Sequence, residues 1–125
     1  MKVGSFALGD AAMDRNLALA RQLRAKKAVV EVFFEGKPVH RMTERRFSVM
    51  RHLLATRPWD FAMIHEIGPD RMHHFFWRHH DPRHPDHDPA SPFGGFILDY
   101  YRLLDRLVGE LLADVPAETA VLIAS

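Results

Sequence analysis

The chain alternates between segments with helical periodicity and short apolar segments without it, and this order limits the folds it can adopt. Apolar residues recur at helical spacing in three segments: 10–27, 43–57 and 93–114. Three other segments are rich in β-branched, aromatic and other apolar residues and are predicted to be strands: 28–34, 59–67 and 119–125. Strands of this kind, alternating with helices, are typical of a buried parallel sheet. We therefore expect an α/β fold with a mainly parallel sheet flanked by helices.

The length of 125 residues predicts one domain. Within this domain, residues 81–92 are rich in proline and histidine and are predicted to form a loop. In a parallel sheet, ligands bind beyond the carboxyl ends of the strands, where functional loops begin. The last predicted strand runs to Ser125 with no such loop after it. The sequence therefore predicts a truncated domain over 1–125, with exposed sheet edges that favour a homo-oligomer.

Composition and charge exclude several classes of function. The formal net charge is only +1, so neither nucleic acid nor an anionic membrane surface is an expected partner. No apolar run approaches the roughly 20 residues that a membrane-spanning helix needs, and no secretory signal is recognisable. The chain has no cysteine, which excludes disulfides, thiolate metal sites and cysteine nucleophiles. A cytoplasmic location is expected.

Histidine is concentrated in one part of the chain, because seven of the nine histidines lie between His65 and His87. Within this region, Asp70 and His74 follow a predicted strand and are four residues apart. On a helical turn, residues at this spacing face the same side, so both side chains could bind one ion. A carboxylate and an imidazole suit zinc, manganese or iron, but two ligands do not complete a site. The alternative for Asp70 is a helix N-cap after Gly-Pro.

Other polar and aromatic residues in this region and before it are expected to have structural roles. His73 is predicted to support the metal ligands or to be exposed, and Phe75, Phe76 and Trp77 to form core or pocket wall. Four histidines are predicted to lie on the solvated surface: His79, His80, His84 and His87. The alternative is that they make the chain a histidine-rich metal-binding or oligomerisation module without catalysis. Four arginines are expected on the solvent side of an amphipathic helix rather than in a phosphate site: Arg41, Arg45, Arg46 and Arg51.

Several motifs in a fixed order resemble the type I phosphodiesterase/nucleotide pyrophosphatase family of the alkaline phosphatase superfamily. They are Trp59-Asp60-Phe61, Ile67-Gly68-Pro69-Asp70-Arg71, His74-x-Phe76-Trp77, Asp81-Pro82-x-His84-Pro85 and Tyr100-Tyr101-x-x-Leu104-Asp105. The resemblance covers the chain from about Thr43 to its end, and implies a partial alkaline-phosphatase-like domain. It also implies a two-metal site, commonly zinc, and a threonine or serine nucleophile that forms a covalent phospho-enzyme.

In that family, a strand like 119–125 leads into an Asp-His-Gly motif that binds metal. Asp70 and His74 match two ligands of the hydrolytic metal. The nucleophile, the upstream aspartate of the second metal and the Asp-His-Gly motif have no counterpart in these 125 residues. The resemblance therefore implies a fragment of a metal-dependent phosphohydrolase that is inactive alone, with a phosphoester as the substrate of its parent enzyme.

Overall fold

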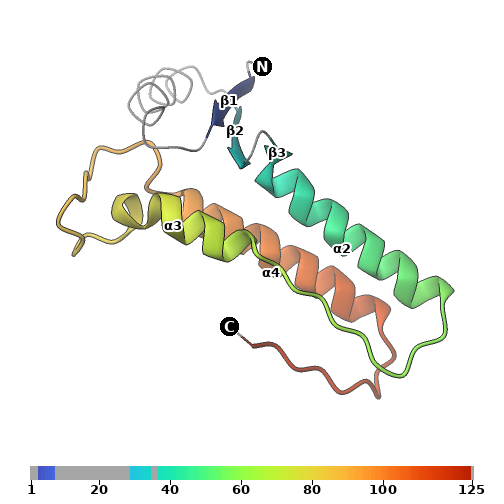
Figure 1. Ribbon diagram of the computed structural model, residues 1–125. Coiled ribbons are helices and arrows are strands. Elements are labelled where there is room, and N and C mark those ends of the chain that lie inside the picture. Colours follow the sequence, from blue (N-terminus) through green and yellow to red (C-terminus); the bar gives the residue numbers. More distant parts are fainter. Residues whose placement is uncertain (1–2, 8–28, 35–36, 125) are drawn as a thin grey trace.

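The computed structural model describes residues 3–7, 29–34 and 37–124 (Figure 1). Within these ranges, three short strands form one sheet: β1 (Val3–Ala7), β2 (Val29–Phe34) and β3 (Lys37–Pro38). The same ranges contain three helices: α2 (Val39–Thr56), α3 (Gly68–His80) and α4 (Phe96–Asp114). The helix predicted over 10–27 lies outside the described residues.

The sheet is small and lies at the N-terminal end of α2 (Figure 1). Strands β1 and β2 pair in parallel, with Val3 opposite Val29, and β2 and β3 pair antiparallel, with Phe33 opposite Pro38. The strand predicted over 28–34 is thus confirmed as β2. Helix α4 packs against both α2 and α3, so the helices rather than the sheet position most of the described side chains.

The expected mainly parallel sheet flanked by helices is wrong for the described part of the chain. Residues 59–67 and 119–124, both predicted to belong to buried strands, have no regular structure. Most of their large apolar side chains face solvent, with Phe61 80% and Leu122 92% exposed. A strand is stable only when neighbouring strands pair with its backbone, and neither segment has such a neighbour in the described structure. A short apolar run therefore gave a misleading signal for a strand.

The helix boundaries differ by a few residues from those predicted. Helix α2 begins at Val39 rather than at Thr43, and it ends at Thr56, close to the expected stop before Pro58. Thr43 is not an N-cap, because its hydroxyl donates to the Val39 carbonyl one turn earlier, at 3.1 Å. Helix α4 begins at Phe96, three residues later than expected. Residues 81–92 contain neither helix nor strand, as predicted.

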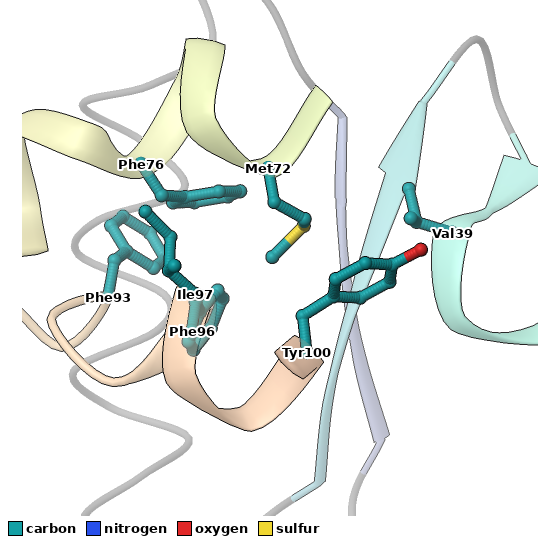
Figure 2. Close-up of a cluster of buried hydrophobic side chains, with 7 residues drawn as sticks. All are labelled: Val39, Met72, Phe76, Phe93, Phe96, Ile97 and Tyr100. Atoms are coloured by element: carbon teal, nitrogen blue, oxygen red, sulfur yellow. The ribbon is translucent and has the colours of Figure 1, made fainter. Parts of the chain in front are cut away.

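The hydrophobic core lies between α3, α4 and the start of α2 (Figure 2). Its buried members are Val39, Met72, Phe76, Phe93, Phe96, Ile97 and Tyr100. The rings of Phe76, Phe93 and Phe96 are mutually close, with centroids 5.1–5.5 Å apart. These contacts hold one face of α3 against α4 and leave its other face open. No helix in the described ranges is long and apolar enough to cross a bilayer.

Candidate metal site on helix α3

The first turn of α3 places Asp70 near the N-terminus of the helix. The N-cap is Ile67, whose side chain cannot cap, and Pro69 follows within the first turn. The alternative that Asp70 is the N-cap is therefore wrong, because Asp70 lies inside the helix. A carboxylate in the first turn interacts favourably with the helix dipole. The prediction that Asp70 and His74 share a helical turn is confirmed.

Asp70 and His74 bring an oxygen and a nitrogen close together on the open face of α3. Asp70 Oδ1 lies 3.4 Å from His74 Nε2, and the two side chains are 55% and 70% exposed respectively. Two donors bound to one tetrahedral zinc at about 2.0–2.1 Å lie about 3.3–3.4 Å apart. The pair therefore fits a zinc ion in both donor chemistry and spacing, and its exposure leaves room for further ligands.

A surface pocket opens beside this pair. It is wide and shallow, with a volume of about 440 Å³, and is lined by Asp70, His73, His74 and Trp77. The His73 ring packs edge-on against Trp77, with centroids 5.3 Å apart, and its Nε2 lies 3.2 Å from the Tyr101 hydroxyl. Trp77 is thus pocket wall, as predicted, whereas its neighbour Phe76 belongs to the core. The aromatic side chains form an apolar wall next to the two polar donors.

No group of three histidine, aspartate or glutamate side chains in the described ranges is arranged to hold a metal. Asp70 and His74 are therefore a pair without a third protein ligand in that part of the chain. The prediction that further ligands come from elsewhere remains a prediction.

Glu66 connects the start of α3 to the other two helices, a role that the sequence analysis did not identify. Its Oε1 accepts a hydrogen bond from the Gly68 amide at 2.8 Å and lies 3.3 Å from the hydroxyl oxygens of both Thr43 and Tyr100. Its Oε2 pairs with Arg46 at 2.8 Å. The signal in the sequence was an acidic residue two positions before a Gly-Pro helix start.

Thr43 and Tyr100 are both fully buried, and their hydroxyl oxygens are 2.7 Å apart. Thr43 donates its one hydroxyl proton to the Val39 carbonyl, so Tyr100 is the donor toward Thr43 or Glu66. Burial, together with the negative charge of Glu66, raises the pKa of Tyr100 well above its usual range. Tyr100 is therefore a neutral donor at physiological pH, and the network is satisfied without ionising it.

The sequence predicts that the four histidines at the end of α3 and in the following loop are all solvated, and the structure shows that one of them is not. His79 is buried, and its ring packs edge-on against Phe93 with centroids 5.3 Å apart. Burial, followed by the positive charge of Arg78, lowers the pKa of His79. The prediction of a surface position is wrong for His79, because the loop folds back and covers the last turn of the helix.

The other three histidines each place a ring nitrogen against backbone. His87 Nδ1 lies 3.0 Å from the Arg78 carbonyl, and His80 Nδ1 lies 3.3 Å from the Gly94 carbonyl. His84 Nδ1 accepts a hydrogen bond from the Asp86 amide at 3.1 Å. The carbonyls at a helix C-terminus lack partners within the helix, so the bond from His87 helps to cap α3. These contacts give the histidines a structural role that requires no metal.

The basic residues of α2 are partly engaged in ion pairs. Arg46 pairs with Glu66, and Arg51 pairs with Glu110 and Asp114 on α4. Arg51 links α2 to α4, and Arg46 links α2 to the segment before α3, so these two arginines are engaged in ion pairs and are not arranged as a phosphate-binding surface.

A carboxylate and an imidazole lie on one exposed helical turn beside an open pocket, and these are two of the donor types that a metal ion such as zinc binds. The comparison with known proteins gives the family. The model of the family described as type I phosphodiesterase / nucleotide pyrophosphatase matches residues 11–125, and the chain belongs to this family of phosphoester hydrolases. No curated protein and no solved structure matches the chain.

Proposed function

We propose that this chain contributes Asp70 and His74 to the divalent metal site, most simply zinc, of a phosphodiesterase-type hydrolase. The observation that carries the proposal is the 3.4 Å separation of Asp70 Oδ1 and His74 Nε2. This distance suits two ligands of one tetrahedral ion. The motif resemblance in the sequence supports the proposal, because it implies that these two residues are metal ligands.

The chain's own residues would have distinct roles in this site. Asp70 supplies negative charge, and His74 binds through Nε2, which requires a neutral ring with its proton on Nδ1. His73 and Trp77 line the pocket beside the pair and would shield one side of a bound phosphoester from water. A bound zinc ion would supply a Lewis acid for the phosphoryl oxygens and would lower the pKa of a bound water.

The proposal includes a division of the site between different parts of the protein. Within the described ranges, only Asp70 and His74 are candidates for this metal, and no third acidic or histidine side chain joins them. The remaining ligands, the second metal and the nucleophile would come from residues outside these ranges. From the family resemblance, we also propose that the 125 residues alone bind zinc weakly and do not turn over substrate.

The test is hydrolysis of bis(p-nitrophenyl) phosphate with added zinc, by the 125-residue chain and by the whole product of its reading frame. Asp70→Asn and His74→Gln should each abolish turnover by the whole product, since the first removes the negative charge of a ligand and the second removes the imidazole. The matched controls are Asp60→Asn and His52→Gln, which change exposed residues of the same types away from the pocket. Undiminished turnover in both ligand variants would exclude the assignment.

A further inference from the structure

Glu66 is almost enclosed, although it lies in a segment without regular structure. Its side chain is only 12% exposed, whereas the neighbouring apolar side chains Phe61 and Met63 face solvent. A buried carboxylate is stable only if its oxygens are hydrogen-bonded or paired with a cation. Both oxygens of Glu66 meet this condition. Oε1 accepts from the Gly68 amide and the buried Tyr100 hydroxyl and lies 3.3 Å from the Thr43 hydroxyl, and Oε2 pairs with Arg46.

These partners come from three separate elements. Thr43 and Arg46 belong to α2, Tyr100 belongs to α4, and Gly68 is the first residue of α3. The Gly68 N–H has no partner within α3, because Gly68 is the first residue of the helix, and Glu66 accepts its hydrogen bond. One carboxylate therefore fixes where α3 begins relative to α2 and α4.

Position 68 has no room for a side chain. A Cβ on Gly68 would lie 1.6 Å from the Tyr100 hydroxyl oxygen and 2.8 Å from Glu66 Oε1. The start of α3 is thus pressed against the network and cannot shift toward α4. Asp70 follows two residues later, and His74 lies one turn further along the same helix.

We propose that Glu66 is a positioning residue for the metal site, because its hydrogen bond to the Gly68 amide fixes the first turn of α3. This inference rests on the proposed function of Asp70 and His74. The first turn itself closes through a bond from the Arg71 amide to the Ile67 carbonyl at 3.2 Å. Without the acceptor at Glu66, this turn frays and the Asp70 carboxylate loses its fixed place opposite His74.

The experiment compares Glu66→Ala, Glu66→Gln and the control Glu110→Ala in the 125-residue chain. Glu110 also links α2 to α4 through an ion pair with Arg51, but it does not touch α3. Zinc affinity is measured by calorimetry, stability by thermal unfolding, and the first turn by hydrogen exchange of the Gly68 and Arg71 amides. Glu66→Ala should weaken zinc binding at least about tenfold, the lower end of effects from residues that orient metal ligands. It should also accelerate exchange of both amides.

Glu66→Gln separates positioning from general stabilisation. Glutamine keeps an oxygen for the Gly68 amide but loses the charge that pairs with Arg46. It should lower stability while retaining the zinc affinity and the slow amide exchange of the unmodified chain, and Glu110→Ala should do the same. If Glu66→Ala does not fold, Gly68→Ala displaces the same helix start while keeping the carboxylate, and should weaken zinc binding similarly.

The outcomes distinguish this inference from the proposed function. The positioning role is overturned, and the ligand assignment stands, if Asp70→Asn and His74→Gln weaken zinc binding but Glu66→Ala does not. If Glu66→Ala does not fold, the same comparison is made with Gly68→Ala. If Glu66→Gln weakens zinc binding as much as Glu66→Ala does, the role of the hydrogen bond to the Gly68 amide is also overturned. If zinc affinity is unchanged in both ligand variants, the proposed function is overturned and the positioning role with it.

Discussion

Ser91 Oγ lies 2.9 Å from Nδ1 of His79, a side chain that is only 5% exposed. Nε2 of the same ring accepts a hydrogen bond from Arg78 Nε at 3.2 Å, so the neutral ring carries its proton on Nδ1 and donates it to Ser91. Ser91 Oγ also accepts from the Phe93 amide at 3.2 Å. A general base would need its lone pair toward the serine, so this pair fastens the loop to α3 and is not a nucleophile with its base.

This arrangement predicts a dependence of stability on pH. Burial lowers the pKa of His79 below its ordinary value of 6.5, so the unfolded chain binds this proton more readily than the folded one. The contribution of neutral His79 is therefore present above pH 6.5 and is lost as the pH falls toward the lowered pKa. In this window, the free energy of unfolding should decrease as the pH is lowered.

Chemical denaturation at a series of pH values measures the effect. In His79→Asn, whose amide nitrogen can still donate to Ser91, the fall on acidification should be smaller. His65→Asn, at an exposed position, should leave it unchanged. Identical pH profiles for His79→Asn and the unmodified chain would show that His79 titrates normally.

Removing the Tyr100 hydroxyl should destabilise the chain without changing its packing. Tyr100→Phe leaves Thr43 and Glu66 short of one hydrogen bond in a buried network, which costs about 1–3 kcal/mol. Tyr101→Phe is the matched control, because its hydroxyl is exposed and should contribute less than about 0.5 kcal/mol. Urea denaturation gives both values. A loss in Tyr100→Phe no larger than in Tyr101→Phe would mean that the buried network contributes no net stability.

Two phenylalanines test the correction to the fold. Phe76 is buried among Phe93 and Phe96, so Phe76→Ala should lower the free energy of unfolding by about 3–5 kcal/mol. Phe61 lies in the segment predicted to be a buried strand but is exposed, so Phe61→Ala should change stability by less than about 0.5 kcal/mol. Thermal or urea unfolding measures the difference. A large loss in Phe61→Ala would instead support a buried strand at 59–67.

The sequence predicted features that depend on local periodicity. The apolar stripe over residues 93–114 predicted α4, and the β-branched and aromatic residues of 28–34 predicted β2. The spacing of Asp70 and His74 likewise placed them on one helical turn. Each of these signals is contained within one element, where side-chain period and backbone geometry are directly linked.

Features that depend on contacts distant in sequence were not predicted. Residues 59–67 and 119–125 have the composition of strands, but whether such a segment pairs depends on what other strands lie beside it. Glu66 is hydrogen-bonded to Tyr100, which lies 34 positions away, and no local pattern indicates this contact. His79 is buried because the loop folds back over the last turn of α3. The residues around His79 in the sequence do not predict this contact, so the sequence analysis placed His79 at the surface.

The central claim is that Asp70 and His74 bind one metal, and its most direct test is a zinc titration followed by the ring ¹⁵N resonances of the nine histidines. The account predicts that His74 Nε2 shifts first, and that Asp70→Asn removes this shift while Asp60→Asn does not. Earlier shifts at His84 and His87, with His74 unaffected, would contradict it and favour a histidine-rich metal-binding loop.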